Sequence, residues 1–403
     1  MFSLLIKMAW KNLFLRSART FLVIVMIAVS MGMMLAIEGL YDGMSINMID
    51  KNKRSASGDI SIFTQNYRVQ RDIKYTIKDA LDIKQNILKM DGVKAVVLRL
   101  RADGLSSTAR KSSFASLIGI NLADEERFGK FSDFLKDGKL EFEKRGAFVG
   151  IELAKRLKVS IGSKLIFSTQ DSAGEINSIS LKVKAIIQTT NIELDNSAIY
   201  VDTNRLHKFL GLPMDEVTQI SIMGSDKGLY SKLKESYPNL SVDSFLELQP
   251  MMKQMQDMMD IFNSITFFIV MSVVFIGIFG VMYVSILDRI REFGIMLSIG
   301  MSYKYIRTQI ILEAFFVGVL GYLSGALIGI AFLIYLKYYG LDMSAFSDAL
   351  AMWGYESVIY GTIKLSYFSN TFLAIMSASL LSVIIPLRKI KRLNPIEVIK
   401  AEK

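Results

Sequence analysis

The chain has 403 residues, of which 51% are hydrophobic, and it carries a formal net charge of +10. It contains no cysteine, which excludes a disulfide framework and a thiolate metal site. The charge is unevenly distributed, because residues 41–260 have a net charge of +3 and the more apolar remainder has +7. These cations flank apolar runs, so the basic balance indicates a membrane protein and no nucleic-acid partner.

Four apolar segments are predicted to cross a membrane as helices, at residues 20–40, 261–287, 309–336 and 365–387. A hydrocarbon core of about 30 Å needs about 20 apolar residues in a helix. The first segment resembles a secretory signal, but its apolar run is long and lacks a convincing cleavage motif, so we expect an uncleaved anchor. Glu38 and Glu313 lie near segment ends, where we expect them at the membrane interface.

Cations near the segment ends predict the orientation of the chain. Lys7 and Lys11 precede the first segment, Arg289 and Arg307 lie between the second and third, and Arg388 follows the fourth. Positive charge favours the cytoplasmic side. We therefore expect an amphipathic helix at 1–19, the 288–308 loop and the 388–403 tail in the cytoplasm. The domain at 41–260 and the 337–364 loop are expected outside.

The segment between the first two spans alternates between strand and helix patterns. Strands are expected near 58–63, 93–100 and 114–120, and a hairpin around 171–177. Helices are expected at 76–90, with Ile77, Leu81 and Leu88 on one face, and near 151–159, 203–210 and 227–236. The predicted fold class is therefore an α-helical membrane protein with four transmembrane helices and an α+β extracytoplasmic domain in two lobes, inserted between helices one and two.

Both ends of this domain are predicted to continue the membrane helices. Residues 245–260 run into the second span without a glycine, and Pro250 suits an early helical position. The first span continues toward Ile49 in the same way. Two rigid stalks would then connect the outer domain to the membrane.

No pattern of catalytic residues is present. The phosphate-binding loop motif is missing, and the single histidine, His207, is expected to be a solvated side chain. The acidic residues 124–126 fit the first turn of a helix better than a cation site. We therefore expect no catalytic residue, no metal and no cofactor bound by this chain, which would make it a non-enzyme powered by another protein.

The 288–308 loop contains a short amphipathic pattern. Phe293, Met296, Leu297 and Gly300 recur at helical spacing, although a surface helix lying on lipid would show the same pattern. The run Arg291-Glu292-Phe293-Gly294-Ile295 with Gly300, Met301 and Ser302, followed by a glycine-rich span, resembles the FtsX/MacB-type permeases of ABC transporters. The tail with Pro386, Arg392, Asn394 and Pro395 and the basic start of the chain resemble that family too.

This resemblance implies a permease that pairs with a second copy or a paralogue and with a separate ATP-binding ABC subunit. ATP and Mg would be bound by that subunit. The loop would dock into it as a coupling helix, and the outer domain would do mechanical work. The residues implied in coupling are Arg291, Glu292, Phe293, Gly294, Met296, Leu297, Gly300, Met301 and Ser302.

Within the family, the chain most resembles the lipoprotein-releasing (Lol) permeases, because it shows four spans, a large outer domain and no fused ATPase domain. The resemblance implies extraction of lipoproteins from the bacterial inner membrane for a periplasmic carrier. The alternatives are a MacB-like efflux or toxin-export permease and a cell-division-type permease that signals to a cell-wall hydrolase.

Two further sites are suggested for the lipoprotein function. Flexible thioethers suit a groove that accepts acyl chains or membrane lipid, although packing between the stalks would need the same spacing. The candidate groove residues are Met44, Met48, Met251, Met255, Met258, Met259 and Phe262. A hook for the carrier is implied at the hairpin turn of Asp171, Ser172, Gly174 and Glu175, where an ordinary turn is the alternative.

Overall fold

The computed structural model describes residues 2–15, 17–143, 145–189, 191–224, 228–346, 349–350, 355 and 357–391. It divides into a helical unit (residues 1–45, 256–343 and 358–403) and a sheet unit (residues 46–255 and 344–357). The tail residues Arg392, Asn394 and Pro395 lie outside the described residues.

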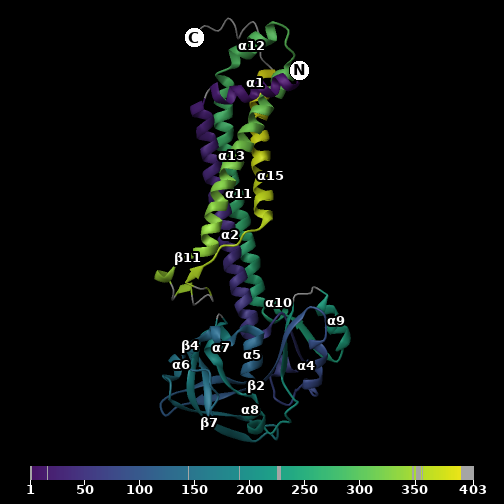
Figure 1. Ribbon diagram of the computed structural model, residues 1–403, viewed down its shortest axis with the longest axis vertical. Helices are drawn as coiled ribbons and strands as arrows, with labels where there is room; N and C mark the ends of the chain where they lie inside the picture. Colours follow the sequence, from purple (N-terminus) through teal and green to yellow (C-terminus); the bar gives the residue numbers. More distant parts are fainter. Residues whose placement is uncertain are drawn as a thin grey trace. The chain divides into compact units, whose positions relative to one another are not determined.

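The helical unit is built from long apolar helices. They are α2 (Ser17–Asn52), α11 (Pro250–Leu287), α13 (Tyr303–Tyr339) and α15 (Leu365–Ser382) with α16 (Ile384–Lys391). Four helices in the described residues are long and apolar enough to cross a membrane, which agrees with the four predicted spans. The amphipathic helix α1 (Phe2–Leu15) and α12 (Ile290–Ser298) lie at one end of the bundle, and the two-stranded sheet of β11 (Leu341–Asp342) and β12 (Val358–Ile359) lies at the other (Figure 1).

The glycines of α13 allow α2 to approach closely. A Cβ added to Gly321 would lie 2.8 Å from side-chain atoms of Ile27, and one added to Gly329 would lie 2.4 Å from Leu35. Small residues at four-residue spacing permit this kind of contact between membrane helices. These glycines therefore pack α13 directly against α2.

The fourth predicted span lies within one candidate span from Leu365 to Lys391, which contains a break where α15 ends at Ser382 and α16 begins at Ile384. Pro386 accounts for the break, since its ring clashes with the carbonyl four residues earlier and provides no N–H for it. Glu38 and Glu313 are each 6% exposed, so both carboxylates are buried against other parts of the chain, and their position at the membrane interface stays a prediction.

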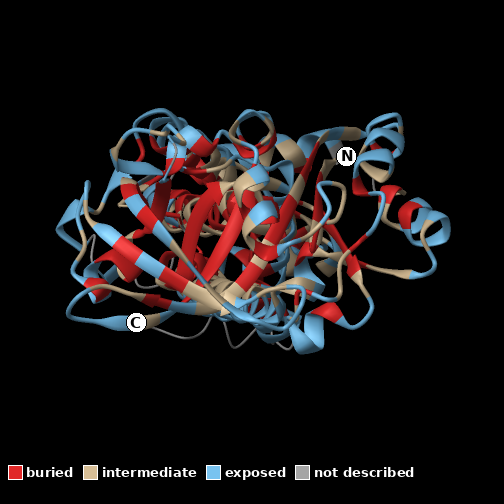
Figure 2. Cartoon of the chain, turned by 90° about the horizontal axis from the view of Figure 1, so that it is seen from below, coloured by how far each residue is buried: buried red, intermediate tan, exposed pale blue. Residues whose placement is uncertain are grey.

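The sheet unit contains a ten-stranded mixed sheet in the order β10-β1-β9-β2-β3-β8-β5-β7-β4, with β6 pairing with β2 and β7. Its strands are β1 (Ile60–Thr64), β2 (Val93–Ser107), β3 (Ser112–Ile120), β4 (Leu135–Gly138), β5 (Gly146–Gly150), β6 (Lys164–Gln170), β7 (Ile176–Ile187), β8 (Ala198–Asp202), β9 (Gln219–Gly224) and β10 (Leu240–Ser244). Buried residues are concentrated on the central strands of the sheet, and the outer strands, helices and loops carry exposed residues as well (Figure 2).

The long strand β2 joins two lobes. Its first half pairs with β9, and its second half pairs with β3 and β6. One lobe is covered by α4 (Ala80–Leu88) and α9 (Leu229–Ser236), and the other carries α6 (Ile151–Leu157), α7 (Ile192–Ser197) and α8 (Thr203–Leu210). The short helices α3 (Tyr67–Gln70), α5 (Leu122–Gly129) and α10 (Phe245–Leu248) complete the unit. The predicted α+β domain in two lobes is confirmed.

The helix predicted at 76–90 is shorter in the structure, where it is α4, and it buries a different face from the one predicted. It begins at Ala80, after Asp79 in the left-handed region, and Thr76 donates its hydroxyl hydrogen bond to the Glu216 carboxylate. Leu81 is 50% exposed, whereas Ile87 is buried, so the predicted apolar face is wrong. The register of the helix is decided by its packing on β2, which a short periodic pattern does not specify.

His207 is part of the core of the sheet unit and not a solvated side chain. It is 2% exposed, and its Nδ1 and Nε2 atoms lie 2.8 Å from the Thr203 carbonyl and 2.7 Å from the Glu216 carbonyl. Leu206 and Leu210 are buried on the same side of α8, so the ring follows their apolar face inward. Its chain neighbours Leu206 and Lys208, one apolar and one charged, did not indicate this.

Both stalks end at neighbouring strands of the sheet. After α2 the chain forms the π-helix η1 (Lys53–Ser57), and β1 follows. β1 pairs antiparallel with β10, from Ile60 opposite Ser244 to Thr64 opposite Leu240. The chain then passes through α10 and breaks at Gln249 before α11 begins at Pro250. The predicted helical extension of the second span is therefore confirmed from Pro250 onward. Residues 245–248 form the separate helix α10, because the residue before a proline is biased away from helical angles.

Candidate functional site: the α12 junction

The loop predicted to couple the chain to another protein contains the helix α12, with well-defined ends. Arg289 occupies its N-cap position, and Gly300 follows its C-terminus with φ of 93°. The Gly300 N–H donates to the Leu297 carbonyl at 3.1 Å, and the Met301 N–H donates to the Met296 carbonyl at 3.0 Å. This pair of bonds is a Schellman motif, which explains why a glycine stands at this position.

The two faces of α12 differ in burial. Phe293 is fully buried in the core of the helical unit, and Met296, Leu297 and Met301 pack against that core. Ile295 is 49% exposed and Ile299 is 77% exposed, with Arg291 and Glu292 exposed beside them. The predicted apolar face therefore anchors α12 to its own chain, and a second, smaller apolar pair remains on the outside.

A buried ion pair holds the start of α12 to α13. The Arg289 Nη1 atom lies 2.9 Å from both carboxylate oxygens of Glu313, and its Nε atom lies 3.2 Å from Glu292. Asn12 of α1 donates to the same Glu313 carboxylate at 2.6 Å. The Arg289 guanidinium also lies 5.0 Å from the centroid of the Phe293 ring. One arginine thus connects α12 to α13, and through Glu313 to α1.

Family models match most of the chain. The MacB-like periplasmic core domain matches residues 20–236, and the FtsX-like permease C-terminal domain matches residues 264–395. The chain belongs to the FtsX/MacB-type permease family. The family relationship predicted from the α12 segment and the tail is therefore confirmed.

The curated relatives of this permease are distant in sequence. It is 23% identical to the macrolide export ATP-binding/permease protein MacB of Chlorobium luteolum over 98% of this chain. It is 25% identical to that of Pasteurella multocida over 62% of this chain. The chain spans 60% and 39% of the length of these two relatives.

Two solved structures match about half of the permease. The periplasmic region of MacB from Actinobacillus actinomycetemcomitans is 15% identical with a TM-score of 0.33, covering 49% of this chain and 92% of that one. The extracellular domain of the transporter YknZ from Gram-positive bacteria is 15% identical with a TM-score of 0.32, covering 46% of this chain and 99% of that one.

The predicted groove residues of the permease do not share one exposed surface. Met48 is 2% exposed, whereas Met251, Met258 and Phe262 are more than half exposed, at 78%, 56% and 57%. Met44, Met255 and Met259 are intermediate. Met48 is a buried packing residue, and the acyl-chain role of the others stays a prediction.

The predicted hook is the tight turn of the β6–β7 hairpin. The Asp171 carboxylate accepts hydrogen bonds from the N–H groups of Ala173 at 2.9 Å and Glu175 at 3.0 Å, and Gly174 has φ of 84°. Ser172 donates its N–H to the Leu210 carbonyl at 3.0 Å. The hairpin is confirmed, and its binding of a carrier stays a prediction.

Sequence reasoning missed the residues with the most distinctive geometry at this site. In the sequence, Arg289 indicates membrane orientation and Glu313 an interfacial position, and no pattern marks Ile299 as exposed. A charged pair at the ends of two adjacent apolar segments was the available signal. In the described residues, no group of three or more His, Asp or Glu side chains is placed to hold a metal ion.

Proposed function

We propose that this chain is a permease subunit that transmits ATP hydrolysis by a separate ATP-binding subunit to mechanical work in the periplasm. The observation that carries this proposal is the surface of α12: Ile295 and Ile299 are exposed on a helix whose opposite face is buried. Exposed apolar side chains on a rigidly held element suit a protein interface. ATP and Mg would be held by the partner subunit.

Arg289 suits the transmission of force from α12. It connects α12 to α13 by two hydrogen bonds of 2.9 Å to Glu313. α11, which precedes this residue, is one helix from Pro250 to Leu287, so a displacement at its end is carried along a stiff element. In this proposal the helices that cross the membrane are residues 20–40, 261–287, 309–336 and 365–387. Two permease copies pair in the bacterial inner membrane, and the 41–260 domain of each lies in the periplasm.

The interface is tested by placing charge on the exposed face of α12. Ile295→Asp and Ile299→Asp are each expected to weaken binding of the ATP-binding subunit by about tenfold or more, because burying an isoleucine contributes about 1.5–3 kcal/mol. Retention of the ATP-binding subunit on the affinity-purified full chain, and ATP hydrolysis by the complex, are the measurements.

Ile299→Leu is the matched control and is expected to retain the ATP-binding subunit. Neither isoleucine belongs to the buried core, so all variants are expected to fold. Size-exclusion chromatography of each purified variant checks this. Unchanged retention in both aspartate variants would exclude α12 as the coupling surface.

For the cargo, we propose lipoproteins extracted from the inner membrane and passed to a periplasmic carrier. Support comes from the resemblance of the chain to the lipoprotein-releasing permeases in its four spans and large outer domain, and from the methionines of α11, of which Met251 and Met258 are exposed. Each methylene of an acyl chain moved out of lipid costs about 0.8 kcal/mol, so the chain would need an apolar surface to cover it.

A MacB-like export permease is the second candidate. The curated relatives of this chain carry the name of macrolide export proteins, and one of them matches 98% of the chain. A permease of the cell-division type, acting on a cell-wall hydrolase, is the remaining alternative.

Native co-purification separates these functions. The full chain is isolated from its own membrane, and the bound proteins and lipids are identified by mass spectrometry. Acylated proteins with a soluble carrier are expected. Recovery of adaptor and outer-membrane channel subunits instead would establish export and overturn the lipoprotein proposal, and recovery of a hydrolase would establish the cell-division type.

Two methionine variants sharpen this experiment. Met255→Asp and Met259→Asp are expected to lose the acylated proteins while retaining the ATP-binding subunit. Met214→Asp, at a 47% exposed position in a loop of the sheet unit, is the control and is expected to retain both. Normal cargo recovery with both variants would remove the groove from the proposal.

A further inference from the structure

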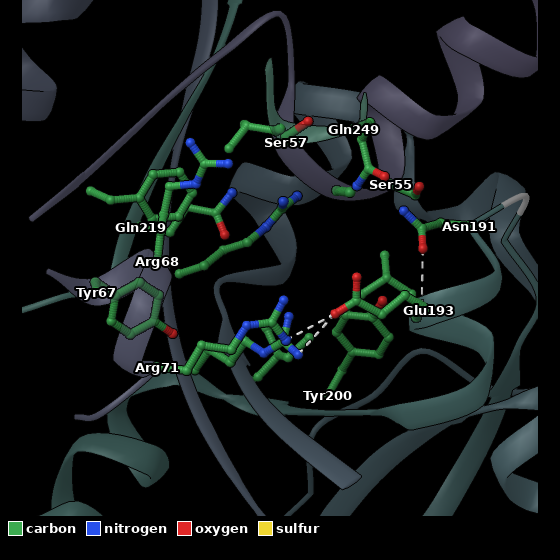
Figure 3. Close-up of a pocket in the computed structure, with 17 residues that line it drawn as sticks. Ser55, Ser57, Tyr67, Arg68, Arg71, Asn191, Glu193, Tyr200, Gln219 and Gln249 are labelled. Carbon is green, nitrogen blue, oxygen red and sulfur yellow. Dashed lines mark hydrogen bonds and ion pairs between the residues drawn. The ribbon is translucent and has the colours of Figure 1, made fainter. Parts of the chain in front are cut away.

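The sheet unit contains a cavity of about 220 Å³ between its two lobes. Polar side chains from separate elements converge on it: Arg68 and Arg71 from the segment after β1, Glu193 from α7, and Tyr200 from β8 (Figure 3). Arg99 and Arg101 of β2 line it as well. Four guanidinium groups and one carboxylate therefore surround the same space.

The arginines leave more donors than the nearby carboxylates use. Arg71 Nη1 and Arg101 Nη2 both approach the same oxygen of Glu193, at 3.1 and 3.2 Å. Arg71 Nη1 also lies 4.0 Å from the Asp103 carboxylate, and Arg101 Nε lies 3.0 Å from it. A guanidinium has five N–H donors in a planar fork, which suits carboxylate and phosphate oxygens. The cavity is thus lined by guanidinium groups whose fork geometry suits the oxygens of an anion.

The Glu193 carboxylate shows that an anion is accommodated here. Burial alone would raise the pKa of Glu193, but the charges of Arg101 and Arg71 outweigh it and hold the pKa below its ordinary value. The carboxylate is therefore an internal example of the group that the guanidiniums bind.

Tyr200 provides a second, independent indication. Its side chain projects into the cavity (Figure 3), it is 3% exposed, and its hydroxyl has no hydrogen-bond partner among the described residues. Burial raises the pKa of this hydroxyl, so it remains a donor at neutral pH. A buried hydroxyl without a partner is costly, and a ligand oxygen would satisfy it.

The ends of both stalks contribute to the cavity wall. Ser55 and Ser57 lie on the π-helix η1 that follows α2, and Leu248 and Gln249 lie at the break before α11. Single turns of π-helix occur often at functional sites. A ligand in this cavity would therefore contact both connections of the domain.

We propose that this cavity binds a small molecule that carries a phosphate or carboxylate group, held by Arg71 and Arg101 and by the Tyr200 hydroxyl. Phe63 and Leu248 provide an apolar surface for its organic part. Binding requires neither the ATP-binding subunit nor the cargo, so its test is independent of the proposed function.

Equilibrium dialysis of the purified full chain in detergent tests this proposal. The probes are inorganic phosphate, glycerol 3-phosphate and succinate. Sodium chloride at about 150 mM screens nonspecific attraction between the protein and the anions. Saturable binding of at least one probe is expected, and comparison of the three identifies the preferred anion. Absence of saturable binding for all three overturns the proposal.

Substitutions in both directions make the result specific. Arg71→Gln is expected to weaken binding about tenfold, because charge-assisted hydrogen bonds are the strong ones, and Tyr200→Phe about threefold. Glu193→Gln is expected to tighten binding about tenfold, because it removes a competing carboxylate, and a folding defect would not produce that gain.

Arg110→Gln, at an exposed position in the β2–β3 turn, is the control and is expected to bind the probes as the unchanged chain does. An equal loss with Arg110→Gln, or no gain with Glu193→Gln, contradicts the site.

Discussion

Replacing Glu313 by alanine is expected to lower the free energy of unfolding by about 3–5 kcal/mol, because it leaves a buried cation without its partner. Arg289 is 8% exposed, and both of its short contacts to α13 are made to this carboxylate. Thermal unfolding of the purified chain, followed by size-exclusion chromatography after heating, measures the loss. In the proposed complex, stimulation of ATP hydrolysis should fall in parallel, because the start of α12 loses its ion pair to α13.

A double substitution distinguishes charge burial from loss of packing. Arg289→Met with Glu313→Leu is expected to recover most of the lost stability, because an apolar pair of similar volume carries no desolvation cost. The ion pair of Arg19 with Asp288 is the matched control, since their side chains are 50% and 39% exposed. Arg19→Gln is expected to cost about 0–1 kcal/mol. An equal loss for Arg19→Gln and Glu313→Ala would contradict the buried role of the Arg289 pair.

In the sheet unit, the largest effect is expected for Glu125→Ala, again a loss of about 3–5 kcal/mol. Arg99 Nε and Nη2 each lie 2.6 Å from an oxygen of Glu125, and the two residues are 6% and 2% exposed. The Arg99 guanidinium also lies 5.3 Å from the Phe128 ring centroid. Chemical denaturation of the full chain, followed by tryptic cleavage between residues 46 and 255, reports the stability of this unit.

An exposed ion pair in the same unit provides the comparison. The Lys155 Nζ atom lies 2.7 Å from the Glu152 Oε1 atom, and the two side chains are 65% and 46% exposed. Glu152→Gln is expected to cost about 0.5 kcal/mol or less, because solvent screens such pairs. Should Glu125→Ala cost no more than Glu152→Gln, the Arg99 pair would not hold the two elements together.

The acidic run at 124–126 illustrates what a local pattern reveals. Its helical setting was expected, and α5 does begin at Leu122 with the Asn121 side chain accepting from the N–H groups of Ala123 and Asp124. The partner of Glu125 was not predictable, because Arg99 lies on β2, 26 residues earlier, and the two meet only when α5 packs on that strand. Helix-capping is local in the chain, whereas ion pairing across elements is not.

Features that depend on consecutive residues were accessible from the sequence alone: the four apolar helices, the hairpin at Asp171, the start of α11 at Pro250 and the family motif around Phe293. Hydrophobic length, turn residues and proline geometry act over a few positions and need no distant partner. The direction in which each side chain points was settled only by packing. Folding decided that Phe293 faces its own chain and Ile299 faces outward, that His207 is buried, and that residues from Ser55 to Gln249 enclose one arginine-rich cavity. An amphipathic pattern indicates that one face of a helix will be buried. Which part of the chain, or which other molecule, buries that face is decided by tertiary contacts.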